Sequence, residues 1–160
     1  MKFCKTILSL IPAIKKREER WEKISDLLVK ISEMQNELKE NAAMFKAIFC
    51  INPIAMVIVG LDDAVLYDAN STFEELSGYK LIDSIGKSVY ELGLYVDVDD
   101  RHRIVAKIIE NGFVRHEPVK FIMQDGRTHE CLLSSKVIVR GGKKLIVSAI
   151  VDSNEIGKLQ

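Results

Sequence analysis

Residues 67–80 read YDANSTFEELSGYK, and this stretch decides the fold. A strand-like apolar run reaches it and ends in Asp-Ala-Asn, a brief helical segment follows, and Gly-Tyr ends that segment. The side-chain oxygen of Asn70 can accept from the amides of a first helical turn. Gly78 permits the left-handed backbone at a helix end, so that Tyr79 can fold back over a sheet. No common catalytic motif has this form, so the stretch does not predict a catalytic loop.

Strand-like runs flank this stretch on both sides. Residues 54–60 are apolar and rich in β-branched side chains, and a polar turn joins them to a second run that begins at Val65, which predicts a hairpin. Three further strands are predicted over residues 113–124, 128–139 and 145–151, separated by glycine-containing turns. The last of these contains LIVSAIV, which is apolar on both faces and therefore predicts a central strand.

Helical patterns fill the interval between the two groups of strands. Residues 70–76 and 80–85 predict two short helices, and a longer helix is predicted after Asp97 and Asp99 and before Gly112. Its apolar stripe consists of Ile104, Val105, Ile108 and Ile109. The order of these elements predicts an α+β domain, with a five-stranded antiparallel sheet and short helices on one face.

A long amphipathic helix is predicted ahead of this domain, because residues 13–49 contain neither glycine nor proline. A seven-residue repeat of apolar positions runs through it for about five heptads, interrupted by Gln35, which is the pattern of a coiled coil. We therefore expect the helix to join two copies of the chain, although it could instead fold back onto the domain. Asn52-Pro53 ends it. The predicted dimer interface consists of Ile14, Trp21, Ile24, Leu28, Ile31, Leu38 and Phe45.

The composition excludes several classes of protein. The chain has 160 residues, 48% of them hydrophobic and 29% charged, and 23 basic side chains balance 23 acidic ones. This balance argues against a surface for nucleic acids or anionic membranes. No apolar stretch has the length of a membrane span, and the N-terminal MKFCKTILSLIPAI lacks the cleavage site of a secretion signal. Three scattered cysteines fit a reducing compartment, so a cytoplasmic location is expected.

The stretch from Phe45 to Glu155 resembles a PAS domain, or sensory box, of bacterial signalling proteins. The motifs that carry the resemblance occur in the family's order: NPIAMVIVGLDDAVLYDAN, which ends in the characteristic Asn70; FEELSGY; LIDSIGKSVYEL; DVDDRHRIVAKIIENG; QDGR; and VDSNE, where the family usually has Asp-Ile-Thr-Glu. The resemblance divides the chain into an N-terminal segment with the dimerisation helix (1–44), a sensory domain (45–155) and a C-terminal tail (156–160).

The resemblance implies a small space between helices and sheet that can hold a ligand. The residues expected to line it are Ile58, Asn70, Phe73, Tyr79, Leu92, Ile104, Ile108, Phe121, Met123 and Leu133, each of which is equally suited to a core. Asp152, at the end of the last strand, is the position expected to couple the domain to its output. Since VDSNE departs from the family's tetrapeptide, the match at this end is incomplete.

The resemblance also raises the question of a cofactor. A flavin adduct needs a cysteine in the segment that here reads GKSVYEL, and none is present. Haem needs an axial ligand, and the candidate on the longer helix is His102, which stands among charged residues like a surface histidine. No cofactor is therefore assigned, haem is disfavoured, and no pattern of metal ligands is found.

No enzymatic motif is found. Ser134 or Ser135 with His129 and Asp125 could suggest a catalytic triad, but alternating strand positions face opposite sides of a sheet. A nucleophile elbow, a phosphate-binding loop and a zincin motif are all missing from the sequence. The resemblance implies a sensory domain that acts through rearrangement of a homodimer on a kinase, a cyclase or a transcription regulator, as in two-component systems. The alternatives are a ligand-free module for dimerisation or protein docking, and a haem-based gas or redox sensor.

Overall fold

The computed structural model describes the backbone of residues 2–156 and the side chains of residues 12–155. The predicted tail, 156–160, lies outside the described residues apart from the backbone of Ile156, and so does Met1. The chain divides into two units, Met1–Lys46 and Ala47–Gln160.

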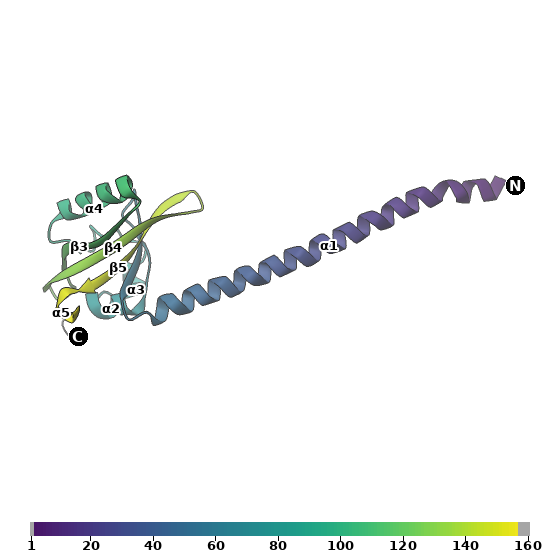
Figure 1. Cartoon of the computed structure of the whole chain (residues 1–160). Helices are drawn as coiled ribbons and strands as arrows, with labels where there is room; N and C mark the ends of the chain where they lie inside the picture. Colours follow the sequence, from purple (N-terminus) through teal and green to yellow (C-terminus); the bar gives the residue numbers. More distant parts are fainter. Residues whose placement is uncertain (1, 157–160) are drawn as a thin grey trace. The chain divides into compact units, whose positions relative to one another are not determined.

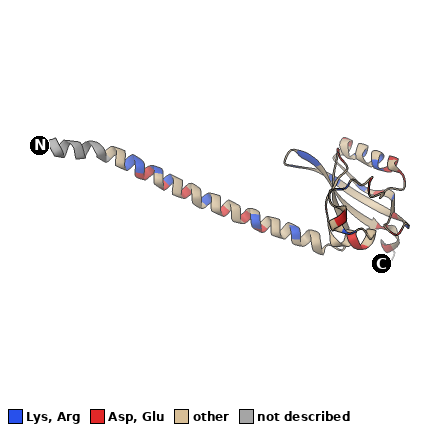
Figure 2. Ribbon diagram, turned by 180° about the vertical axis from the view of Figure 1, so that it is seen from behind, with Lys and Arg blue, Asp and Glu red and all other residues tan. Residues whose placement is uncertain are grey.

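The first unit consists of most of helix α1 (Lys2–Ile51). The helix ends one residue before Asn52-Pro53, as predicted. Basic and acidic side chains are interspersed along it (Figure 2). From Ile14 to Phe45 its large apolar side chains are exposed in the single chain, and the seven residues of the predicted dimer interface are all among them.

The second unit contains one antiparallel sheet, whose strands are drawn in Figure 1. The strand order is β2-β1-β5-β4-β3. The predicted hairpin at the start and the central place of the last strand are therefore confirmed. The bounds are β1 (Ala55–Gly60), β2 (Leu66–Ala69), β3 (Phe113–Ile122), β4 (Thr128–Arg140) and β5 (Lys143–Asp152).

Helices fill the interval between β2 and β3, as predicted, and one more short helix follows β5. Their bounds are α2 (Ser71–Ser77), α3 (Leu81–Ser84), α4 (Val98–Asn111) and α5 (Ser153–Ile156). Helix α5 was not predicted, and the strand predicted over 113–124 ends at Ile122. On α4, Ile104 and Ile108 are buried as expected, but Ile109 is exposed and Arg101 takes a buried place one turn earlier.

The capping residues of the opening stretch behave as the sequence predicts. Asn70 caps α2, and its side-chain oxygen accepts from the Phe73 amide at 3.0 Å. Gly78 adopts a left-handed conformation, with φ of 76°, and ends the helix. The Tyr79 hydroxyl then donates to the Leu92 carbonyl at 2.6 Å, which ties the segment after α2 to the loop before α4.

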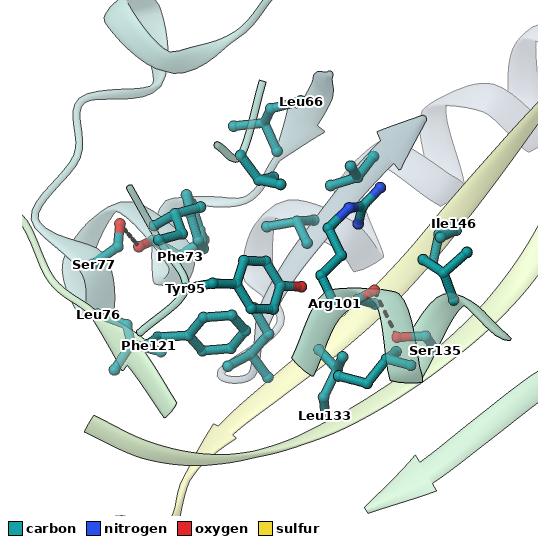
Figure 3. Close-up of a pocket in the computed structure, with 18 of the residues that line it drawn as sticks. Leu66, Phe73, Leu76, Ser77, Tyr95, Arg101, Phe121, Leu133, Ser135 and Ile146 are labelled. Atoms are coloured by element: carbon teal, nitrogen blue, oxygen red, sulfur yellow. Dashed lines mark hydrogen bonds between the residues drawn. The ribbon is translucent and has the colours of Figure 1, made fainter. Parts of the chain in front are cut away.

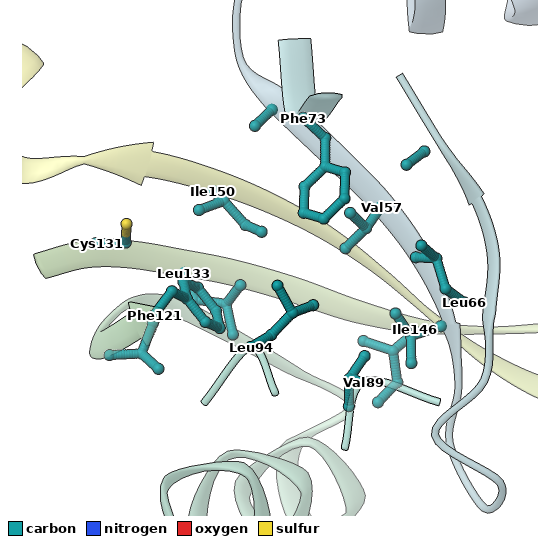
Figure 4. Close-up of a cluster of buried hydrophobic side chains, with 14 of the residues drawn as sticks. Val57, Leu66, Phe73, Val89, Leu94, Phe121, Cys131, Leu133, Ile146 and Ile150 are labelled. Atoms are coloured by element: carbon teal, nitrogen blue, oxygen red, sulfur yellow. The ribbon is translucent and has the colours of Figure 1, made fainter. Parts of the chain in front are cut away.

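The main core lies between the helices and the inner face of the sheet, and Figure 4 shows part of it. Alternation places Val119, Phe121 and Met123 in this core, while Lys120 is exposed. A second, smaller cluster lies apart from it and contains Phe49, at the end of α1, with Ile58, Leu145 and their neighbours Met56 and Val147.

Candidate functional site

A small cavity lies inside the main core, between the sheet and helices α2 and α4. Its volume is about 40 Å³, and most of its walls are apolar (Figure 3). A water molecule needs about 10–15 Å³ measured in this way, so the space equals about three waters. A flavin or haem therefore cannot enter without displacement of core side chains, because sites for larger ligands have volumes of about 300–1,000 Å³.

Six of the ten residues expected to line a pocket do line this cavity. They come from α2, α4, β3, β4 and the segment just after β3, so the topology brings together segments far apart in the sequence. These residues are Phe73, Ile104, Ile108, Phe121, Met123 and Leu133.

The other four lie elsewhere. Ile58 belongs to the smaller cluster with Phe49, because its strand neighbours Val57 and Val59 take the positions that face the cavity. Leu92 is buried in the main core without reaching the cavity, and Tyr79 packs against that core from outside.

Asn70 does not line the cavity either, because its side chain is engaged in a buried network of hydrogen bonds to the backbone. It is only 1% exposed. Its Nδ2 donates to the carbonyls of Phe49 at 3.1 Å and Ile54 at 2.9 Å, and its Oδ1 accepts from the amides of Met56 at 2.9 Å and Phe73 at 3.0 Å. The side chain therefore fastens the end of α1, the start of β1 and the start of α2 to one another.

The cavity also has polar groups that sequence reasoning missed. Arg101 stands in the charged run DDRHR (99–103), which predicts a solvated helix start, but it is 5% exposed and lines the cavity. The signal that could have found it is spacing, because Arg101, Ile104 and Ile108 lie at i, i+3 and i+7 on one helix face. Ser135 and Ser148 line the cavity as a cross-strand pair, and their hydroxyls are 2.7 Å apart.

Tyr95 completes the polar part of the cavity. Its hydroxyl points toward the Arg101 side chain (Figure 3). Burial raises the pKa of the Tyr95 phenol, and the charge and hydrogen bond of the Arg101 guanidinium offset part of that rise. The phenol is therefore neutral near pH 7 and available as a donor or acceptor.

His102 lies outside the cavity. Its side chain is exposed, and its Nδ1 is 3.4 Å from Asp99 Oδ1. It therefore cannot reach a group bound in the cavity as an axial ligand. In the segment GKSVYEL the wall residue is Val89. Within the residues that the structure describes, no group of three potential ligand side chains could hold a metal ion.

Asp152, the expected output residue, lies at the junction of β5 and α5. It is buried, its Oδ2 is 2.6 Å from His129 Nδ1, and its Oδ1 accepts from the Asn154 amide at 2.8 Å. Burial alone would raise the pKa of Asp152, but the hydrogen bonds from Asn154 and His129 outweigh it and hold that pKa below its ordinary value.

The described helices include none that is both long and apolar enough to cross a membrane.

Comparisons with known proteins agree with this geometry. The sequence profile described as a PAS domain matches residues 53–155. A search of curated protein sequences found no match. Among solved structures, the chain is similar to the PAS domain of an HTR-like protein from Haloarcula marismortui, with 18% identity, a TM-score of 0.58, and coverage of 76% of this chain and 98% of that one.

Two further solved structures show the same fold. One is a PAS domain from a two-component sensor histidine kinase, with 13% identity, a TM-score of 0.60, and coverage of 74% of this chain and 99% of that one. The other is the PAS domain, in complex with ethanol, of a LuxR-family transcriptional regulator from Burkholderia thailandensis, with 22% identity, a TM-score of 0.57, and coverage of 69% and 97%.

Proposed function

The chain belongs to the PAS domain family, and from this premise we propose that it is a sensory signal-transduction domain without catalytic activity. A small ligand or a change of packing in the cavity alters the arrangement of a homodimer, and a downstream kinase, cyclase or transcription regulator responds. The proposed location is the cytoplasm. The solved relatives from a histidine kinase and a transcriptional regulator support this class of function.

The observation that carries the proposal is a single row of side chains on β5. Ile146, Ser148 and Ile150 line the cavity, and Asp152 is the next residue on the same face of the strand. Leu133 on β4 also lines the cavity and pairs with Ile150. A ligand that displaces these side chains therefore acts directly on the strand whose end holds the proposed output residue.

The homodimer is proposed to form through α1. Trp21 is 63% exposed and Leu28 is 61% exposed, and they occupy equivalent positions one heptad apart. An isolated helix cannot bury such a stripe, and apolar residues repeated every 3.5 positions pack best against a second helix of the same kind. Gln35 on the same stripe is the type of polar interruption that fixes the register of two helices.

Native mass spectrometry of the purified chain tests both parts together, since it reports the mass of the dimer and of any retained small molecule. Trp21 provides a second readout because it is the single tryptophan of the chain. We expect its emission to shift to longer wavelength on dilution. Leu28→Glu should abolish the dimer, whereas Val29→Glu, on the outer side of the predicted repeat and 54% exposed, should retain it. A chain that stays monomeric at all concentrations would contradict the proposal.

The second candidate is a ligand-free module for dimerisation or docking. The small volume of the cavity, about 40 Å³, favours it, because most ligand sites are several times larger. Two results would support this candidate. The protein, purified without additives, would show the mass of the dimer with no small molecule bound, and small compounds added in a screen would not change that mass.

A further inference from the structure

The charged group that lines the cavity is the Arg101 guanidinium, and Arg101 is 5% exposed. Arg101 donates from Nη2 to the Gly60 carbonyl at 3.1 Å, and its guanidinium lies 5.7 Å from the centre of the Tyr90 ring. Among the residues that the structure describes, no Asp or Glu side chain forms an ion pair with it. The adjacent carboxylate, Asp100, is 2.8 Å from Arg103 instead.

A buried cation of this kind is costly unless an anion compensates it. The guanidinium has five N–H donors in a planar fork that matches a carboxylate. The Gly60 carbonyl and the Tyr95 hydroxyl use part of this set. The Ser135 and Ser148 hydroxyls add a donor, because the bond between them uses only one of their two protons.

The rest of the cavity determines what kind of anion fits. The apolar walls suit an alkyl group and offer a second charge neither a hydrogen bond nor a counter-charge. They include Phe73, Ile104 and Leu133. One buried cation cannot balance a phosphate dianion, and a halide would leave the apolar part empty. The cavity has room for about three waters, which corresponds to a ligand of about three to five heavy atoms.

We propose that the cavity is a site for a short-chain monocarboxylate such as acetate or propionate, with its carboxylate on Arg101 and its alkyl group against the apolar walls. This inference rests on the proposed sensory function and deepens it, because it names the chemical class of the ligand. It also explains why a charged residue lies on the buried face of α4.

The test uses the wild-type full chain and pairs of probes that differ only in charge. Acetate and propionate are titrated against acetamide and propionamide in a chloride-free buffer, and ¹H–¹⁵N NMR follows the amides of Gly60, Ile104 and Ser148. We expect saturable shifts with the carboxylates and at least tenfold weaker binding of the amides. Equal binding of the amides, equal effects of sodium chloride, or no saturable shift up to about 0.1 M carboxylate would each overturn the inference.

Variants then locate the site. Arg101→Met should weaken acetate binding by at least tenfold, while Arg115→Met, the same change at an exposed arginine, should leave it unaltered. Ser135→Ala should weaken binding by a smaller factor. If Arg101→Met does not fold, the comparison of carboxylate with amide still decides. The dimer measurement is independent, so a dimer that binds no carboxylate refutes only this inference, and a monomer that binds one refutes only the proposed dimer mechanism.

Discussion

Replacement of Asn70 by aspartate tests the hydrogen-bond network of Asn70 at the start of the domain. The substitution keeps the volume of the side chain and the acceptor that serves Met56 and Phe73. It removes the amide donor that serves the carbonyls of Phe49 and Ile54, and it places a carboxylate oxygen against those carbonyls. The site is 1% exposed, so water cannot take over the lost bonds.

The magnitude follows from these contacts. Each lost hydrogen bond contributes about 1 kcal/mol, and each buried carbonyl left without its donor adds a comparable cost. We therefore expect Asn70→Asp to lower the free energy of unfolding of the domain by about 4 kcal/mol near pH 7, a large part of the 5–15 kcal/mol typical of a domain. Burial raises the pKa of the introduced carboxyl, so the loss should shrink on acidification as that group regains a proton to donate.

The assay is urea unfolding followed by the NMR signals of the domain, with Asn52→Asp as the matched control. Asn52 uses its Oδ1 to accept from the Ile54 amide, an acceptor role that aspartate retains. The control should therefore stay within about 0.5 kcal/mol of wild type. The stabilising role of the Asn70 network would be refuted by equal losses of unfolding free energy in the two variants, or by a loss below about 1 kcal/mol for Asn70→Asp.

Three further outcomes are expected. Gly78→Ala should cost about 1–2 kcal/mol of stability in thermal unfolding and more than Gly112→Ala, because both glycines are left-handed but an added Cβ at Gly78 meets the Gln124 Cβ at 3.3 Å. Iodoacetamide should modify the exposed Cys50 but not Cys131 in the native protein, as read by peptide mapping, because Cys131 is buried and burial, with the charge of Asp152, raises the pKa of its thiol to about 12. Stability linked to Asp152 should be present above the ordinary carboxyl pKa of about 3.9 and lost as the pH falls through its lower folded-state pKa. Asp152→Asn should lack this part of the acid transition in unfolding scans at different pH.

Local patterns were enough to predict most of the fold. The alternation of Val119 and Phe121 indicates the inner face of β3, because Lys120 between them marks the solvent side. The helix cap at Asn70 and the turn at Gly78 depend on the chemistry of single residues, so no tertiary information was needed. The exposed α5 was missed because a four-residue helix has too few positions to show a period.

The composition of the cavity wall was only partly predictable, for a physical reason. In AMVIVG every central residue is apolar. No alternating polar residue therefore distinguishes Val57 and Val59, which face the cavity, from Ile58 on the other side of the sheet. The outer side is covered by Phe49, whose position depends on the tertiary fold. Charge in a sequence predicts exposure, so no local pattern of charge indicates that Arg101 is buried, with its guanidinium bonded to the Gly60 carbonyl.

The size of the cavity limits how a signal could arise in it. A ligand of four heavy atoms can supply at most about 6 kcal/mol, since the best small ligands reach about 1.5 kcal/mol per atom. Reversing a two-state equilibrium from 1:99 to 99:1 needs about 5.5 kcal/mol of difference in affinity between the two states. Almost all of the binding energy would then have to come from contacts made in one state alone. Apolar contacts with the walls change little when a small alkyl group shifts, whereas the bond between a carboxylate and Arg101 depends on the position of α4, which carries that arginine. Any strong response through this cavity therefore depends on the charged contact, and a neutral compound of the same size should leave the dimer unchanged.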